Sequence, residues 1–224
     1  MTTLVDTPNS TPQPLLHREW MAYYEAVKGR PPRDTLRFAL DRFDLIPESQ
    51  SSSQTRQINS SRFAVDLGCG DGRDTVEILR RGWQVLAIDG SPEAIDRLLQ
   101  RPDVDPTAFQ TRVEKFESLT LAPNSTDLVN ASFCLPFCSA EQFSTLWATI
   151  VDSLHVGGRL SCHLYGDRDS WRKYPNLCFH RYAQVQDLLT AFDLEWFKEE
   201  EHPGVTPLGE ERYWHIFHIV ARKR

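Results

Sequence analysis

The residues of this chain best suited to bind a ligand are three alternating glycines, Gly68, Gly70 and Gly72, which follow an apolar run at residues 63–67. The run has the pattern of a short buried strand, and Arg73 begins a segment of helical pattern. Glycine lets the backbone turn tightly and lets a ligand lie close to it, and a helix N-terminus attracts the negative end of a ligand. In open α/β sheets, ligands bind at this carboxyl edge of the strands. We therefore predict a small-molecule site here.

The spacing of these glycines argues against two kinds of phosphate-binding loop. Counted from Gly68 the sixth position is Arg73, and counted from Gly70 it is Thr75, so the dinucleotide pattern Gly-x-Gly-x-x-Gly/Ala is not met. The Lys-Ser/Thr pair of a P-loop is missing as well.

Two acids lie at the ends of the strands beside this loop. Asp66 is at the end of the first strand, where a carboxylate would repel a pyrophosphate but could bind an ammonium group. Asp89 ends the second strand, seventeen residues after Gly72, and an acid at this place accepts hydrogen bonds from ribose hydroxyls. The two acids therefore favour a ligand with an ammonium group and a ribose.

Five segments in order along the chain closely resemble the motifs of class I S-adenosylmethionine-dependent methyltransferases. They are residues 65–72, 88–91, 116–117, 127–132 and 154–160. The resemblance extends from about Arg62 to the C-terminus. It implies an α/β fold with a Rossmann-like, seven-stranded, mostly parallel sheet of order 3-2-1-4-5-7-6, in which strand 7 is antiparallel and helices cover both faces. Within this family, the Gly-Cys-Gly-x-Gly-Arg start and residues 219–223 are similar to the small-molecule and tellurite-resistance-type branch.

The resemblance also implies how S-adenosylmethionine would be bound. Gly68 and Gly70 would line its methionine moiety, and Asp66 or the backbone near Ala131 would meet its ammonium group. Asp89 would bind the ribose. The predicted cofactor-binding residues are Tyr24, Asp66, Gly68, Gly70, Gly72, Arg73, Asp89, Gly90, Ser91, Phe116, Glu117 and Ala131.

The segment expected at the adenine departs from a common pattern of the family. There a polar residue often precedes the apolar one, whereas here Phe116 precedes Glu117. Which of the two residues meets the adenine amino group is therefore left open. Arg73 has two interpretations, a surface charge at a helix start or a group near the ligand carboxylate.

The chain divides into four segments by composition and pattern. Residues 1–14 are expected to form a disordered tail, 15–47 an N-terminal helical cap, 48–61 a polar loop and 62–224 the S-adenosylmethionine-binding domain. In that domain, strands are predicted at residues 63–67, 84–88, 109–113, 127–130, 159–165, 194–197 and 214–220. Helices are predicted at residues 73–81, from 91, from 139 to the glycines at 157–158, and at 182–192.

The cap has two alternative roles. It could fold over the cofactor as a lid in which Tyr24 and Arg30 touch the ligand, or its aromatic residues could only anchor a helix. The second interpretation is favoured for Trp20.

No catalytic residue is assigned, because methyl transfer mainly requires that two reactants be positioned and water excluded. The histidines on or after the fifth strand and in the closing hairpin are each expected to be structural; they are His163, His180, His215 and His218. After the fourth strand there is no Asn-Pro-Pro-Tyr-type signature, which argues against amino methylation of DNA or of protein glutamine. Phe133, Leu135 and Phe137 predict either an apolar acceptor pocket or core packing.

Composition limits the partners and the location. The formal net charge is −6 and no Lys/Arg-rich run is present, so a nucleic-acid partner is not expected. The five cysteines include no Cys-x-x-Cys pair, which predicts free thiols in a reducing cytoplasm and no metal site. Residues 1–14 have no basic residue and no continuous apolar run, so they are not expected to be a signal peptide. No run approaches about 20 apolar residues, so no membrane association is expected.

The sequence thus predicts a cytoplasmic enzyme that transfers a methyl group from S-adenosylmethionine to a small-molecule acceptor, with S-adenosylhomocysteine as product. Two alternatives stay open. One is a non-catalytic module or partner subunit that binds S-adenosylmethionine or S-adenosylhomocysteine, and the other is a nicotinamide-dependent oxidoreductase, which the glycine spacing opposes. The acceptor, the atom methylated and the oligomeric state are not specified.

Overall fold

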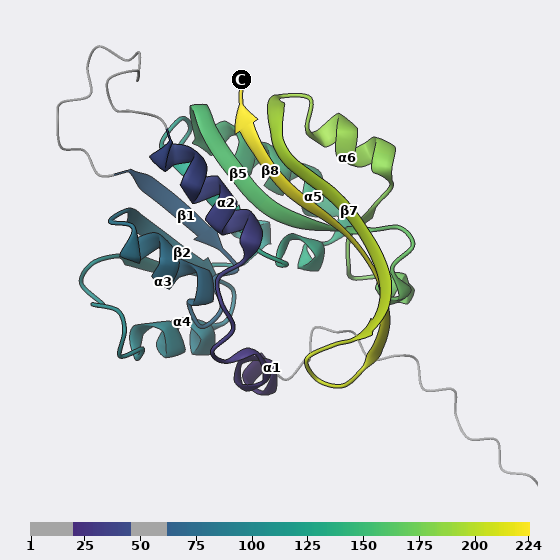
Figure 1. Ribbon diagram of the computed structural model, residues 1–224, viewed down its shortest axis with the longest axis horizontal. Coiled ribbons are helices and arrows are strands. Elements are labelled where there is room, and N and C mark those ends of the chain that lie inside the picture. Colours follow the sequence, from purple (N-terminus) through teal and green to yellow (C-terminus); the bar gives the residue numbers. More distant parts are fainter. Residues whose placement is uncertain (1–19, 46–61) are drawn as a thin grey trace, which may run out of the picture.

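The computed structural model describes residues 20–45 and 62–224, which form one mixed sheet with helices on both faces (Figure 1). The strands are β1 (Phe63–Leu67), β2 (Gln84–Asp89), β3 (Gln110–Val113), β4 (Thr126–Ala131), β5 (Leu154–Gly166), β6 (Phe179–His180), β7 (Phe192–Val205) and β8 (Glu211–Lys223). The α-helices are α1 (Trp20–Val27), α2 (Asp34–Asp44), α3 (Arg73–Arg80), α4 (Pro92–Leu99), α5 (Ala140–Ser153) and α6 (Tyr182–Leu188). Residues 1–19 and 46–61, which include the predicted tail and polar loop, lie outside the described residues.

The sheet has the order β3-β2-β1-β4-β5-β8-β7, and β6 pairs with β5 off this path. Strands β1 to β5 are parallel, whereas β8 is antiparallel to both β5 and β7. This confirms the order predicted from the resemblance, with one addition. The two-residue strand β6 pairs with the last residues of β5, at Tyr165 and Gly166, beyond the end of β4. Because β6 is counted, the last two strands of the sheet are numbered β8 and β7 where the prediction numbered them 7 and 6.

Alternation along the strands builds two separate cores. Val65 of β1 and Leu86 of β2 face a core that includes α5 and α6, and their neighbours Ala64 and Val85 face a second core. Helices α2, α3 and α4 cover that second face (Figure 1). A strand with apolar residues on both faces is what a parallel sheet between two helical layers requires.

Helix α2, expected in the cap, packs on the sheet itself. Its Leu36 and Leu40 are fully buried, and its Phe43 meets Trp83 with the ring centroids 4.9 Å apart. Phe38 packs edge-on against Trp196 of β7 in the same way, at 5.2 Å. The helix therefore shares the core of the sheet, whereas α1 lies over the carboxyl edge.

Two predicted helix ends were wrong. Helix α5 stops at Ser153, and Leu154 is the first residue of β5 rather than part of the helix. The pair at residues 157–158 lies within β5, next to an irregularity in the pairing with β4. A Cβ on Gly158 would lie only 3.1 Å from the carbonyl oxygens of Thr126 and Asp127, so this glycine permits close approach of the strands. Helix α6 likewise ends at Leu188 instead of residue 192.

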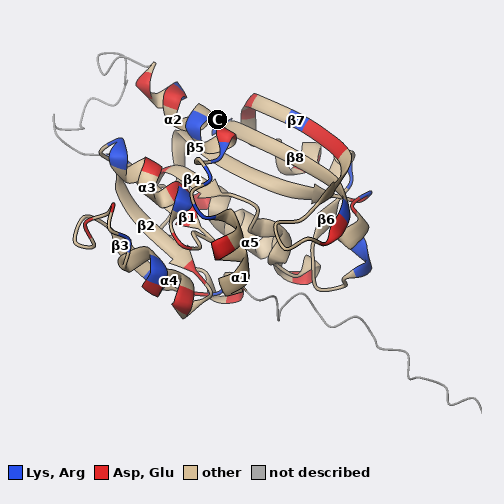
Figure 2. Ribbon diagram, turned by 60° about the horizontal axis from the view of Figure 1, so that its bottom comes forward, with Lys and Arg blue, Asp and Glu red and all other residues tan. Residues whose placement is uncertain are grey.

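The outer strand β7 is strongly charged (Figure 2). Lys198 and the three consecutive glutamates at residues 199–201 lie on it. Charged residues on an edge strand discourage its pairing with another chain. Among the described residues, no helix is both long and apolar enough to cross a bilayer.

Candidate functional site

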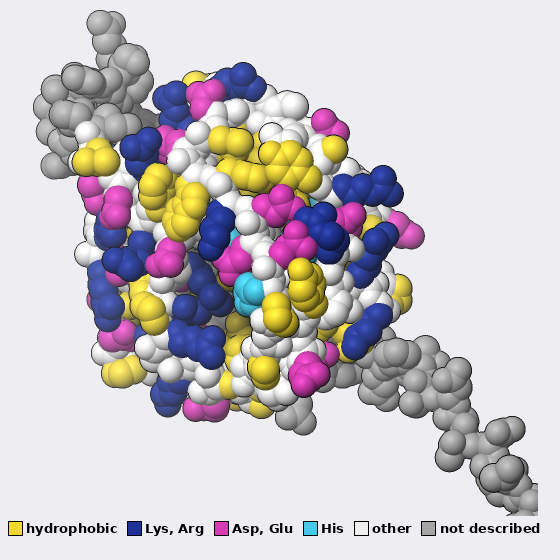
Figure 3. Space-filling model, turned by 45° about the vertical axis from the view of Figure 1, so that its right-hand side comes forward, with side chains coloured by type: hydrophobic (Ala, Val, Ile, Leu, Met, Phe, Trp, Pro, Cys, Tyr) yellow, Lys and Arg dark blue, Asp and Glu magenta, His cyan; other side chains and the backbone are white. Residues whose placement is uncertain are grey.

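A cavity of about 1150 Å³ lies at the carboxyl ends of the parallel strands. Its walls come from α1, the loops after β1, β2, β3 and β4, the end of β5, and the β7–β8 hairpin. On the face shown in Figure 3, basic side chains gather next to hydrophobic ones. The volume exceeds that of the usual pocket for one small molecule, about 300–1,000 Å³, so the cavity has room for two ligands side by side.

The glycine loop has a backbone conformation that other residues rarely adopt. Gly68, Gly70 and Gly72 have φ values of +60°, +55° and +85°. A Cβ on Gly68 would lie 2.3 Å from the Cβ of Cys134, which packs under the loop. Both the positive φ and the missing space therefore require glycine at position 68.

Asp89 ties this loop to the loop after β2. One carboxylate oxygen accepts a hydrogen bond from the backbone N–H of Gly70, and the other accepts one from the N–H of Ser91, each at 2.9 Å. Burial raises the pKa of Asp89, while the backbone N–H donors of Ser91 and Gly70 oppose that shift. Because each carboxylate oxygen can accept a second hydrogen bond and Asp89 lines the cavity, a ligand with two adjacent hydroxyls could bind here.

Asp66 belongs to a buried polar network at the end of β1. It accepts hydrogen bonds from the hydroxyl of Thr75, at 2.6 Å, and from the side-chain amide of Asn130, at 2.8 Å. The same amide nitrogen donates to Asp74, at 3.1 Å, and Asp74 also accepts from the backbone N–H of Arg33, at 3.0 Å. Burial, and next the charge of Asp74, raises the pKa of Asp66 to about 7. A cationic group at this end of the cavity would relieve that repulsion.

Asn130, Asp74 and Thr75 are the polar residues of this network to which the sequence assigned no role. Asn130 is fully buried in β4, and Asp74 is 5% exposed at the start of α3. A polar residue in the middle of the apolar run of β4 was the available signal, because buried amides are almost always hydrogen-bonded.

Helix α1 lies across the glycine loop. A Cβ on Gly70 would be 3.1 Å from the ring of Tyr24, and the Tyr24 side chain is almost completely buried. Burial, with a further contribution from the charge of Asp89, raises the pKa of Tyr24. Glu25 forms an ion pair with Arg97 of α4, and the Trp20 ring packs edge-on against Phe137 at 5.3 Å. The helix thus holds an aromatic cover over the loop.

The structure gathers most of the predicted cofactor residues around this cavity. Phe116 and Glu117 line it from the short 3-10 helix Phe116–Ser118 after β3. Gly72 and Ala131 do not line it. Gly72 instead precedes α3, where a Cβ would overlap Leu98 of α4, and Ala131 is fully buried at the end of β4. The predicted residues that do line the cavity are Tyr24, Asp66, Gly68, Gly70, Arg73, Asp89, Gly90, Ser91, Phe116 and Glu117.

The histidines of β5 and its neighbours lie behind the cavity wall. His163 is buried and stacks on Phe133 with the ring centroids 4.0 Å apart, and burial lowers its pKa well below the usual value. Burial also lowers the pKa of His180 to about 4. Among the described residues, the histidine that lines the cavity is His202, whose ring already contacts Glu200.

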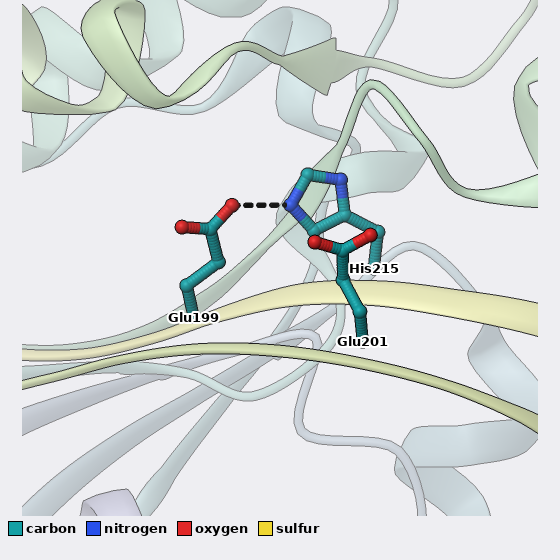
Figure 4. Close-up of side chains that lie close together, drawn as sticks. All are labelled: Glu199, Glu201 and His215. Carbon is teal, nitrogen blue, oxygen red and sulfur yellow. Dashed lines mark hydrogen bonds and ion pairs between the residues drawn. The ribbon is translucent and has the colours of Figure 1, made fainter.

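Glu199, Glu201 and His215 form a cluster whose composition would suit a metal ion (Figure 4). The guanidinium of Arg168 occupies its centre, 2.6 Å from Glu199 and 2.5 Å from Glu201. The backbone N–H of Arg168 donates to Nδ1 of His215, so Nε2 carries the proton and donates to Glu199. Arg168 therefore offsets part of the negative charge of the two acids, and the cluster is an ion-pair network that joins β7, β8 and the segment after β5.

Comparison with known proteins defines the class to which this fold and site belong. Residues 64–158 match the family model described as "Methyltransferase domain". The chain also resembles the N-methyltransferase NodS of Bradyrhizobium japonicum in complex with S-adenosylhomocysteine, with a TM-score of 0.61, 15% identity, and coverage of 96% of this chain and 93% of that one. The predicted fold is therefore confirmed: the chain has the class I fold of S-adenosylmethionine-dependent methyltransferases, and its residues 64–158 are similar to a methyltransferase domain.

Three further proteins are similar to this chain in fold or in part of the sequence. TehB of Haemophilus influenzae has a TM-score of 0.60 at 14% identity and covers 79% of this chain and 65% of its own. The 1,6-didemethyltoxoflavin-N1-methyltransferase of Burkholderia thailandensis has a TM-score of 0.59 at 17% identity, with coverage of 98% and 93%. A probable cobalt-precorrin-6B C(15)-methyltransferase (decarboxylating) of Methanococcus vannielii is 34% identical over 73 residues, 32% of this chain. That match spans 41% of the relative's length.

Proposed function

We propose that this protein transfers a methyl group from S-adenosylmethionine to a small-molecule acceptor. The observation that carries the proposal is the position of Asp89. Its carboxylate is held by the N–H groups of Gly70 and Ser91 at the wall of a cavity large enough for two ligands. When bound, S-adenosylmethionine supplies an electrophilic methyl group on a sulfonium sulfur and leaves as S-adenosylhomocysteine.

The residues around the cavity fit the parts of this cofactor. Asp89 would accept hydrogen bonds from the ribose hydroxyls, and Phe116 and Glu117 would hold the adenine. Asp66 would meet the ammonium group, which explains why a carboxyl beside a second acid is kept in a buried place. Gly68 would let the methionine part lie against the backbone.

The chain itself would then position the acceptor and exclude water. Tyr24 and Trp20 of α1 cover one side of the cavity, and the hairpin of β7 and β8 bounds the other. Positioning a nucleophile in line with the methyl group supplies most of what such a transfer needs. An acceptor that arrives with a free lone pair requires no base; one that arrives protonated would lose its proton to solvent or to a group at the cavity mouth.

A small acceptor and a cytoplasmic location complete the proposal. Helix α1 and the hairpin form walls on two sides of the cavity, which suits a small molecule better than a polymer. The formal net charge of −6 disfavours nucleic acid, and all five cysteines are free and buried, as is usual in a reducing compartment. We further propose that residues 62–224 form the methyltransferase domain and residues 15–47 its N-terminal extension.

Calorimetric titration with S-adenosylhomocysteine tests this function. We expect micromolar or tighter binding by the wild type. Asp89→Ala should weaken it by about 1–3 kcal/mol, as expected for lost hydrogen bonds to a charged group. Asp96→Ala, at an exposed acid on α4, is the matched control and should bind as the wild type does.

Three results would contradict parts of the proposal. Unchanged affinity of Asp89→Ala would remove the ribose assignment. Binding of S-adenosylhomocysteine without transfer of labelled methyl to any member of a broad acceptor panel would favour the non-catalytic alternative. A thermal shift with NAD(P) and none with S-adenosylhomocysteine would favour an oxidoreductase.

A further inference from the structure

The two halves of the cavity differ in charge. The lining carboxylates all come from the side of β1, β2 and β3; they are Asp66, Asp71, Asp74, Asp89, Glu93, Glu114 and Glu117. We define the acceptor half as the lining residues that follow β4 or belong to β5 and the β7–β8 hairpin. They are Ser132, Phe133, Cys134, Phe137, Tyr165, His202, Val205, Thr206, Pro207, Arg212, Trp214 and Ile216. Within the described part of the chain, this half has no lining carboxylate, and it contains an arginine.

That arginine, Arg212, is only 3% exposed. Its Nε and Nη2 donate to the two carboxylate oxygens of Asp169, at 2.9 Å and 2.8 Å. Its remaining nitrogen, Nη1, is buried and has no hydrogen-bond partner among the described residues. A buried donor without a partner is unfavourable. Because Arg212 is one of the residues that line the cavity, this unpaired N–H group indicates a missing hydrogen-bond acceptor.

An aromatic box fixes the plane of this guanidinium. Its central carbon lies 3.7 Å from the ring centroid of Trp171, 3.8 Å from that of Trp214 and 4.2 Å from that of Tyr165. The indole N–H of Trp171 is held in turn by Glu210, at 3.1 Å. Because the fork toward Asp169 and the stacked rings leave the guanidinium no freedom to rotate, Nη1 is a preorganised donor.

The surroundings of Nη1 select the kind of acceptor atom. Asp169 offsets most of the charge of Arg212, and one guanidinium NH₂ group offers few hydrogen bonds. This suits a monoanion better than a phosphate, which needs several donors. Arg33 adds positive charge at the edge of the acceptor half, with its guanidinium 4.4 Å from the Phe133 ring centroid. Next to Nη1, the walls are rings and apolar side chains.

We propose that the acceptor is a small aromatic carboxylic acid. Its carboxylate accepts a hydrogen bond from Nη1 of Arg212, and its ring packs among Phe133, Tyr165 and Trp214. This substrate class rests on the proposed methyl transfer. The methylated atom would be an atom other than the carboxylate, on the side of the molecule that faces the cofactor half of the cavity.

The test is binding of matched probes to the full chain in the presence of saturating S-adenosylhomocysteine. The probes are benzoate, 4-hydroxybenzoate, 2-aminobenzoate and quinoline-2-carboxylate, each compared with its neutral amide by calorimetry. We expect at least one carboxylate to bind the wild type about tenfold or more tightly than its amide, as a hydrogen bond to a charged group predicts. If no carboxylate binds more tightly than its amide, the proposal is wrong.

The variant Arg212→Lys tests the residue. It keeps a positive charge beside Asp169 but removes the guanidinium fork, and we expect it to lose the carboxylate preference. Arg222→Lys is the matched control, because Arg222 is an exposed arginine of the same strand that pairs with Asp193; it should keep the preference. An unchanged preference in a folded Arg212→Lys protein would overturn the assignment.

The outcomes separate this inference from the proposed function. If S-adenosylhomocysteine does not bind the wild type, the proposed function itself is wrong. If S-adenosylhomocysteine binds but no carboxylate binds more tightly than its amide, only the proposed substrate class is wrong. Should Arg212→Lys fail to fold, the comparison of carboxylates with amides on the wild type still decides the proposal.

Discussion

Gly68 shows how a single residue can limit the whole site. Gly68→Ala would place a Cβ 2.3 Å from that of Cys134 at a φ of +60°. The unfavourable backbone costs about 1–2 kcal/mol, and overpacking adds about 1–3 kcal/mol. We therefore expect the free energy of unfolding to fall by about 2–5 kcal/mol in urea denaturation.

Gly82→Ala is the control for that substitution. Gly82 has a φ of +78° but open space around its Cβ position, so only the backbone cost should remain, about 1–2 kcal/mol. Equal losses in the two variants would mean that the contact with Cys134 relaxes freely and does not restrict the glycine loop.

The buried carboxyl of Asp66 predicts a dependence of stability on pH. Its folded-state pKa is raised to about 7 from a usual value of 3.8, by burial first and the charge of Asp74 second. The folded protein therefore holds this proton more tightly than the unfolded chain, and the free energy of unfolding should fall as the pH rises from about 4 to about 7.

The variant Asp66→Asn isolates this contribution. Across the same window its free energy of unfolding should rise relative to that of the wild type, by at most about 1.4 kcal/mol per pH unit. The control Asp96→Asn, at an exposed acid of α4, should give a curve parallel to the wild type. Parallel curves for wild type and Asp66→Asn would show that Asp66 is already ionised in the folded state at low pH.

At the scale of elements, α1 (Trp20–Val27) is attached mainly through side chains. Tyr24 rests on the glycine loop, and Glu25 pairs with Arg97. By contrast, α2 buries Leu36 and Leu40 completely against the sheet. Elements with few buried apolar contacts open most readily.

Hydrogen exchange should therefore distinguish the two helices. We expect amides of α1 to exchange faster than those of α2 in the free protein. Saturating S-adenosylhomocysteine should slow exchange in α1 by about tenfold or more, because a ligand that binds only the covered state stabilises it, while α2 serves as the internal reference. Exchange in α1 that ignores the ligand would argue that Tyr24 takes no part in the site.

The elements also show what a sequence can predict. The glycine loop and the acid at position 89 have local signatures, a strand followed by special backbone and a helix start, and they lie where expected. Arg212 and Asn130 gave no such signal. The hydrogen-bond partner of Arg212 is Asp169, 43 residues away. That of Asn130 is Asp66, 64 residues away. Contacts between residues far apart in the sequence cannot be predicted from spacing along the chain.

The ends of α5 and α6 were missed for a related reason. Leu154 has the apolar character of the α5 face, yet the backbone turns extended there because β4 offers a pairing partner at Thr126. Tertiary pairing thus overrode local periodicity, as it often does at the end of an element. Strand order came from the family resemblance and not from periodicity.

At the scale of the whole molecule, the position of α2 predicts one cooperative unit. Leu40→Ala would open a cavity in the core that α2 shares with Trp83 and Val85, and the free energy of unfolding should fall by about 2–5 kcal/mol. Leu45→Ala is the matched control at a side chain that is 71% exposed, where a change within about 0.5 kcal/mol is expected. Urea unfolding followed by tryptophan fluorescence and by far-ultraviolet circular dichroism should give coincident transitions in both variants, since α2 and the sheet lose the same core together. An early loss of helical signal in Leu40→Ala, with the fluorescence transition left at its wild-type midpoint, would instead mean that the N-terminal segment unfolds as a separate cap.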